Sequence, residues 1–181
     1  MNVSRAEELL RLADAQEVRL ERHLLVAAAL REVLAHEPVV VGGTAEEFYT
    51  VDEYHETDLD LCTWLSSQEE AFLSDLGFEQ RGRHWVHQTS KVAVEFPESR
   101  IAGDETRIRR ESVESGVVAI IGVEDLYLDR VRQATADSGG GRSRTAPVWR
   151  SGPRRSTSWT GHMSRPRSRQ RLTPTLDWGD P

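Results

Sequence analysis

The order of apolar and polar residues predicts two helices before residue 38. The first follows residues 4–7, whose Ser-Arg-Ala-Glu sequence has the form of a capping box with Ser4 as the N-cap. The second is predicted by apolar residues at steps of three and four, namely Leu20, Leu24, Ala27, Leu30 and Leu34. Pro38 ends this pattern. We therefore expect a helical N-terminal part over residues 1–37.

Two strands are predicted next, with a short helix between them. Residues 39–41 are three valines followed by Gly42 and Gly43, which is typical of a buried strand that enters a tight turn. A helix is predicted from Thr44 to Thr50. Residues 58–62 read Asp-Leu-Asp-Leu-Cys, and this alternation predicts a strand with two different faces.

The remaining elements complete an α+β pattern. A capping box at Ser67 predicts a helix that ends before Gly77. Strands are predicted over residues 79–87, 91–96 and 116–123, and a helix over 124–136. We therefore expect an α+β fold with a small mixed β-sheet flanked by helices.

The charge balance changes abruptly near Ser138. Residues 1–137 hold 28 acidic and 14 basic residues, whereas residues 138–181 hold 2 acids and 9 arginines. This composition predicts a folded acidic domain over 1–137 and a basic tail over 138–181 that does not fold alone. Three interpretations of the tail stay open: a shifted reading frame, a disordered tail, and an Arg/Trp arm that binds nucleic acid.

Composition also excludes several classes of protein. A single cysteine, Cys62, rules out an internal disulfide framework. No run approaches the roughly 18 apolar residues of a membrane span, and the N-terminus lacks the apolar core of a secretory signal. We expect a cytoplasmic protein. The acidity of residues 1–137 argues against a broad basic face for nucleic acid.

The candidate chemistry begins with two aspartates on one strand. Because side chains alternate along a strand, Asp58 and Asp60 project from the same face. Neighbouring carboxylates repel each other unless a cation lies between them. Mg²⁺ prefers oxygen ligands and also binds phosphate. Glu95, on an otherwise apolar strand, is the candidate for a third carboxylate.

The diglycine turn predicts a phosphate site beside these acids. Gly42 and Gly43 lack Cβ atoms, so their backbone N–H groups can approach an anion closely. A helix that begins at Thr44 would add free N–H groups and a favourable dipole. The Thr44 hydroxyl would add one hydrogen bond.

The paired motif resembles the polymerase-β-like nucleotidyltransferase superfamily. The similarity lies in Val39-Val40-Val41-Gly42-Gly43-Thr44-Ala45 and Thr57-Asp58-Leu59-Asp60-Leu61, within a region of about residues 35–135. It looks most like the small stand-alone prokaryotic members similar to AbiEii-type toxins of toxin–antitoxin systems. Family members often carry Asp at the position of Glu95.

The resemblance implies a reaction and a set of partners. The reaction is Mg²⁺-dependent transfer of a nucleoside monophosphate from an NTP to an acceptor hydroxyl on RNA, protein or a small molecule. Asp58, Asp60 and Glu95 would ligate metal, and Glu95 would serve as the base. Gly42, Gly43 and Thr44 would hold phosphate. An antitoxin-like protein is the expected partner, and no membrane is involved.

Other interpretations stay open at this stage. The first is a catalytically inactive member of the same fold that binds a nucleotide or a protein. The Asp-x-Asp pair also occurs in glycosyltransferases and in haloacid-dehalogenase-type phosphatases. A zinc site from His84, His87 and Cys62 is disfavoured, because residues three apart on a strand face opposite ways.

Overall fold

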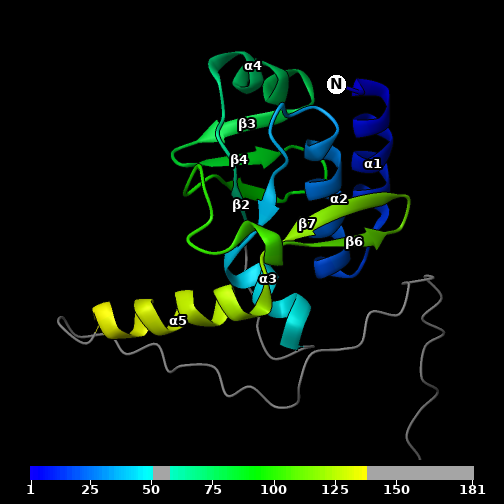
Figure 1. Cartoon of the computed structure of the whole chain (residues 1–181). Coiled ribbons are helices and arrows are strands. Elements are labelled where there is room, and N and C mark those ends of the chain that lie inside the picture. Colours follow the sequence, from blue (N-terminus) through cyan, green and yellow to red (C-terminus); the bar gives the residue numbers. More distant parts are fainter. Residues whose placement is uncertain (51–57, 138–181) are drawn as a thin grey trace, which may run out of the picture.

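The computed structural model describes residues 1–50 and 58–137. The acidic run of Asp52, Glu53 and Glu56, whose sequence predicts a solvated loop, lies outside the described residues, and so does the tail expected over residues 138–181. The described helices are α1 (Val3–Ala15), α2 (Arg19–Arg31), α3 (Gly42–Thr50), α4 (Ser67–Asp75) and α5 (Val123–Asp137), with a 3₁₀ turn over Glu105–Arg107. The described strands are β1 (Val39–Val40), β2 (Asp58–Cys62), β3 (Phe78–Arg81), β4 (His84–His87), β5 (Ala93–Glu95), β6 (Arg109–Val113) and β7 (Gly116–Ile120). This combination of helices and strands confirms the expected α+β class (Figure 1).

The seven strands form one mixed sheet in the order β3-β4-β5-β2-β1-β7-β6. Two pairings are parallel, β2 with β5 and β1 with β7, and the remaining ones are antiparallel. The parallel pairings join segments that are far apart in the sequence. Because β2 pairs with both β1 and β5, it lies in the middle of the sheet.

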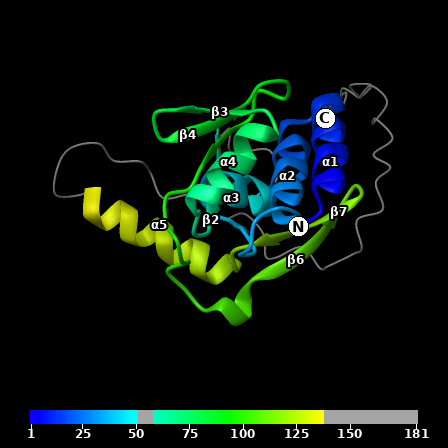
Figure 2. The same ribbon diagram turned by 90° about the horizontal axis from the view of Figure 1, so that it is seen from above.

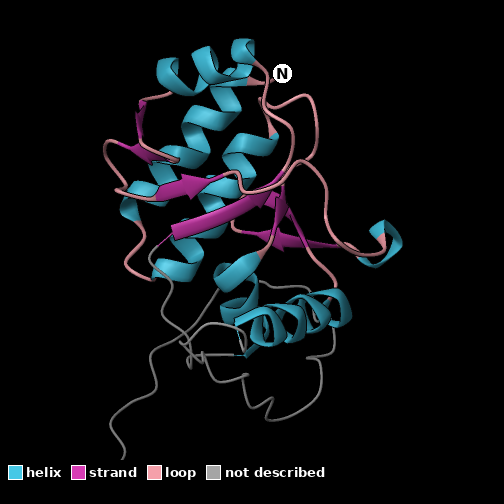
Figure 3. Ribbon diagram, turned by 90° about the vertical axis from the view of Figure 1, so that its left-hand side faces the viewer, coloured by secondary structure: helices cyan, strands magenta, loops and turns pink. Residues whose placement is uncertain are grey.

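Helices α1 and α2 pack side by side, and α2 also packs against β7, β6 and β2. Figures 2 and 3 show this helical layer against one side of the strands. The apolar positions of β2, Leu59 and Leu61, are fully buried together with Val94 of β5. Burying one set of alternate positions leaves the other set, which includes Asp58 and Asp60, on the opposite face.

The predicted strand over residues 79–87 is wrong. This stretch folds as two strands, β3 and β4, which pair antiparallel across a turn at Gly82 with a φ of +64°. That conformation suits glycine, because a Cβ atom disfavours the left-handed region. The hairpin places β4, rather than β3, next to β5.

Helix starts were predicted near their true positions but not on the correct residues. Asn2, not Ser4, caps α1, since its Oδ1 accepts a hydrogen bond from the Arg5 N–H at 3.2 Å. The capping box of α4 uses Ser66 and Glu69, one residue before the predicted Ser67. Helix α3 begins at Gly42, two residues before the predicted start at Thr44.

Strand β6 was not predicted, because its Arg-Arg-Glu-Ser-Val sequence has little apolar character. Gly77 follows α4 with a φ of +87°, which confirms the predicted glycine at that helix end. Among the described helices, none has the length and apolar character that a bilayer crossing requires.

Candidate functional site

Strand register brings four polar side chains to one face of the sheet. In the parallel pair of β2 and β5, Asp60 lies opposite Glu95 and Asp58 lies opposite Ala93. In the antiparallel pair of β4 and β5, His84 lies opposite Glu95. Directly paired residues project to the same face. Asp58, Asp60, His84 and Glu95 therefore share the face turned away from Leu59 and Leu61.

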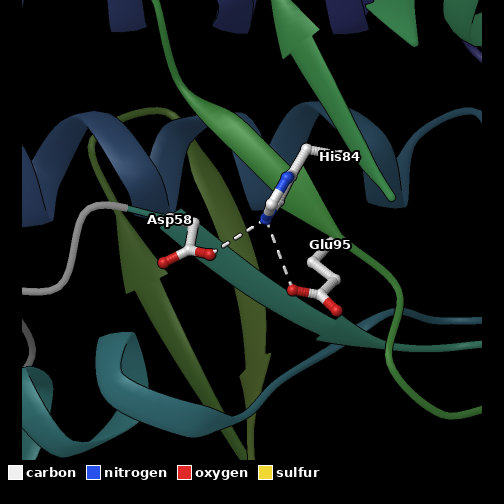
Figure 4. A group of neighbouring side chains, drawn as sticks. All are labelled: Asp58, His84 and Glu95. Atoms are coloured by element: carbon white, nitrogen blue, oxygen red, sulfur yellow. Dashed lines mark hydrogen bonds and ion pairs between the residues drawn. The ribbon is translucent and has the colours of Figure 1, made fainter. Parts of the chain in front are cut away.

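Three of these side chains meet at a single point, as Figure 4 shows. His84 Nε2 lies 3.2 Å from Asp58 Oδ2 and 3.4 Å from Glu95 Oε2. One potential ligand atom from each residue lies within 4.8 Å of the other two. The side chains are 22% (Asp58), 28% (His84) and 15% (Glu95) exposed, so solutes can reach them although most of their surface is covered. Arg83 Nε lies 3.2 Å from Glu95 Oε2 and adds positive charge at the rim.

Asp60 contacts the diglycine turn. A Cβ atom built on Gly42 would lie 2.1 Å from Asp60 Oδ2, and Gly42 has a φ of +62°. The Val41 N–H donates to the Asp60 carbonyl oxygen at 3.0 Å, which fixes the turn against β2. The sequence expectation that the glycine turn and the aspartate strand lie together is met at Gly42 and Asp60.

Thr44, two residues after Gly42 in α3, is fully buried. Its hydroxyl donates to the Asp58 carbonyl oxygen at 3.2 Å and lies 3.3 Å from His23 Nδ1. Since the side chain is satisfied inside the protein, it positions β2 against α3. The predicted phosphate contact stays a prediction for the backbone N–H groups of Gly42, Gly43 and Thr44.

His23 lies behind Thr44 and is also buried. Burial, reinforced by the positive charges of Arg19 and Arg22, lowers the pKa of His23 to about 4. Asp58 opposes this shift and does not cancel it. A neutral imidazole therefore supports Thr44 near neutral pH.

The donor set fits a divalent cation. Asp58 and Glu95 offer carboxylate oxygens and His84 offers an imidazole nitrogen, whereas Asp60 shares the face but is not part of this group. Within the described residues, Asp58, His84 and Glu95 form the one group of three His, Cys, Asp or Glu side chains with this spacing. A cation bound between Asp58 and Glu95 would offset the repulsion between their carboxylates.

His87, Cys62 and Trp85 pack inside the protein and lie outside this group of ligands. His87 faces away from His84, packs on Phe78 and places Nδ1 2.8 Å from Ser90 Oγ, so the two histidines lie on opposite faces as expected. Cys62 is buried, and burial raises the pKa of its thiol to about 11. Trp85 is a buried core residue.

Arg130 forms an ion pair rather than lining this site. Its Nε lies 3.0 Å from Glu46 Oε2, and the Glu46 side chain is only 2% exposed. The pair joins α5 to α3. Arg19 forms a second link of this kind, with both oxygens of Glu47 at 3.1 Å.

Sequence reasoning did not identify His84 as a site residue. It was considered only with His87 and Cys62 as a zinc set, and the described structure does not bring those three together. The signal that could have identified it is the cross-strand pairing with Glu95, which depends on recognising the turn at Gly82.

Comparisons with protein families, with curated proteins and with solved structures find no match to this chain. The resemblance of the two motifs to nucleotidyltransferases therefore stays a prediction.

Proposed function

We propose that this chain is a metal-dependent nucleotidyltransferase of the polymerase-β-like type. The observation that carries the proposal is the contact between Gly42 and Asp60, on the same face that holds Asp58 and Glu95. This arrangement puts a candidate phosphate-binding turn against the Asp60 carboxylate, on the face that also holds Asp58 and Glu95. Phosphoryl transfer needs both features, because the substrate and the metal must meet at one point.

The turn would hold the phosphates of the NTP. Helix α3 starts at Gly42, and the first N–H groups of a helix have no partner within the helix. They favour an anion through both hydrogen bonding and the helix dipole. The bare Cα atom of Gly42 makes room for the Asp60 carboxylate, which lies where a Cβ atom would stand.

Asp58, Asp60 and Glu95 would hold Mg²⁺, the cofactor that the resemblance implies. When bound, the metal would neutralise phosphate charge and orient the reacting group. The three acids lie on two adjacent strands of a paired sheet, which limits their movement. Strand pairing therefore positions the ligands before any substrate arrives.

The reaction would displace pyrophosphate. The acceptor oxygen forms a bond to the α-phosphorus, and the bond from that phosphorus to the oxygen bridging the α- and β-phosphates breaks. Glu95 takes the acceptor proton, and pyrophosphate leaves with the electron pair of the broken bond. The acceptor would be a hydroxyl of RNA, protein or a small molecule, and an antitoxin-like protein would block this face.

Labelled NTPs test the proposal. The purified chain is incubated with Mg²⁺ and each of four α-³²P-labelled NTPs, with and without cellular RNA and protein. We expect label on an acceptor for the wild type and none for Asp58→Asn or Asp60→Asn. Asp75→Asn is the matched control, because Asp75 is an exposed acid at the end of α4. Equal labelling by the wild type and both site variants would reject the proposal.

A second candidate function is a catalytically inactive nucleotide-binding or protein-binding module. The observation that favours it is that the acids already have partners within the protein: His84 lies beside Asp58 and Glu95, and the Arg83 guanidinium lies beside Glu95. Such partners reduce the need for a metal. NTP binding without transfer, unchanged in Asp58→Asn, would support this function over catalysis.

A further inference from the structure

We infer that Asp58, His84 and Glu95 form a binding site for a transition-metal ion, with a preference for ions such as Co²⁺ or Zn²⁺ over Mg²⁺. The inference deepens the proposed function, because it names the class of cation that the same face selects. It rests on that proposal only through the shared residues Asp58 and Glu95.

The three side chains already converge on one point. His84 Nε2 faces both carboxylates, at 3.2 Å from Asp58 Oδ2 and 3.4 Å from Glu95 Oε2, and Figure 4 shows the three groups converging. All three ligand atoms lie within 4.8 Å of one another. Small side-chain rotations bring such a set to the roughly 2.0–2.2 Å that N and O ligands adopt around Zn²⁺.

The mixed nitrogen and oxygen donors of this group favour a transition metal over Mg²⁺. Imidazole suits Zn²⁺, Cu²⁺, Fe²⁺ and Ni²⁺, whereas Mg²⁺ takes oxygen ligands and keeps much of its water. Affinity for a given N/O site rises from Mn²⁺ through Co²⁺ to Cu²⁺. Replacing one oxygen ligand by the His84 nitrogen therefore shifts selectivity away from Mg²⁺.

Strand pairing holds the three ligand residues rigidly. The three residues come from three adjacent strands, β2, β5 and β4, and His84 and Glu95 are direct cross-strand partners. Ligands on paired strands keep their spacing better than ligands on loops. Arg83 is a weak competitor for Glu95, since its side chain is 71% exposed and exposed ion pairs contribute little.

Metal binding by the NTP-free full chain tests the inference. Co²⁺ is titrated by calorimetry and visible absorption, and Mg²⁺ is then added as the competitor. We expect one Co²⁺ per chain and an affinity at least about tenfold above that for Mg²⁺. His84→Ala should lower Co²⁺ affinity by about tenfold or more, with Mg²⁺ affinity changed less than about threefold because the carboxylates remain.

His36→Ala is the matched control, because it removes an exposed imidazole that packs on Trp64 away from the three ligands. It should bind Co²⁺ as the wild type does. A measurement that needs no variant is selective paramagnetic broadening of the His84 ring resonances when Co²⁺ is added to the wild type. Unbroadened His84 signals, or equal Co²⁺ affinity in wild type and His84→Ala, would overturn the inference.

The two proposals fail in different ways. His84-dependent Co²⁺ binding without nucleotide transfer would leave the metal site standing and remove the proposed activity. Transfer that depends on Asp58 and Asp60, together with Co²⁺ binding that ignores His84, would do the reverse.

Discussion

Gly42 and Asp60 are in such close contact that a side chain at position 42 would overlap the Asp60 carboxylate. A Cβ atom there would lie 2.1 Å from Asp60 Oδ2, and the backbone φ of +62° already disfavours any residue with a side chain. The contact joins the start of α3 to the middle of β2. Both the stability of this junction and the position of the Asp60 carboxylate therefore depend on one missing methyl group.

Gly42→Ala should destabilise the protein and disturb the site. Gly82→Ala is the control, because Gly82 has a similar φ of +64° but no atom within 4 Å of the added Cβ. We expect Gly82→Ala to cost about 1–2 kcal/mol of unfolding free energy from backbone strain. Gly42→Ala should cost about 1–3 kcal/mol more from overpacking. Urea unfolding measures both, and equal losses in the two variants would contradict the contact.

Thr44→Val should destabilise the junction without changing the charge of the site. The variant removes the hydroxyl that donates to the Asp58 carbonyl oxygen and lies beside His23. Leaving a buried acceptor unsatisfied costs about 1–3 kcal/mol. Thr135→Val is the control, since the Thr135 hydroxyl bonds only to its own exposed helix, and it should change stability by less than about 0.5 kcal/mol. Similar effects of the two substitutions would argue against a positioning role for Thr44.

Acid should destabilise the protein through His23. The pKa of His23 is lowered to about 4 in the folded protein, from 6.5. Above pH 6.5 both folded and unfolded forms are neutral, so this group adds no pH dependence there. Below pH 6.5 the unfolded chain binds the proton first, and stability should fall by up to about 1.4 kcal/mol per pH unit until about pH 4.

His23→Asn tests this pH dependence, because an amide can still contact Thr44 and does not titrate. Unfolding free energies between pH 7 and pH 4 should fall less steeply in the variant than in the wild type. A smaller residual slope should remain, since burial also lowers the pKa of His87. Parallel curves for the two proteins would exclude His23 as the source.

Arg130→Met should loosen the attachment of α5. The substitution leaves the carboxylate of Glu46, which is 2% exposed, without its Arg130 contact. Breaking one side of a buried ion pair costs about 3–5 kcal/mol. Arg81→Met, which breaks an ion pair between side chains 64% and 51% exposed, should lower the free energy of unfolding far less than Arg130→Met does.

A double-mutant cycle identifies the Glu46–Arg130 pair as the cause. Glu46→Gln combined with Arg130→Met should recover part of the stability that Arg130→Met loses, because the buried negative charge is gone. Strictly additive effects of the two substitutions would show that Arg130 stabilises α5 in some other way.

The sequence predicted the strand at β2 because it carries its own signal. Asp58, Leu59, Asp60 and Leu61 alternate, and burial of the two leucines against the helices directs both aspartates to the other face. The valines before Gly42 were equally informative, since a β-branched run before a diglycine favours a strand and a turn. Local sequence was therefore sufficient to predict β2 and the strand before Gly42.

The partners of β2 could not be predicted in the same way. The parallel pairing with β5 joins residues about 35 positions apart, and no local pattern specifies it. The turn at Gly82 was read as part of one strand, and this displaced His84 from its true neighbour Glu95. The turn of the β6–β7 hairpin includes Ser115 at a φ of 70°, a conformation that serine rarely signals.

Metal-dependent nucleotide binding tests the central claim most directly. Calorimetry with an NTP analogue that cannot be cleaved between the α- and β-phosphates should show binding by the wild type only when a divalent cation is present. Binding should be lost in the Asp58→Asn/Asp60→Asn double variant and kept in Asp75→Asn. Equal binding without a divalent cation, or by the double variant, would contradict the claim that the acids beside Gly42 form a nucleotide site.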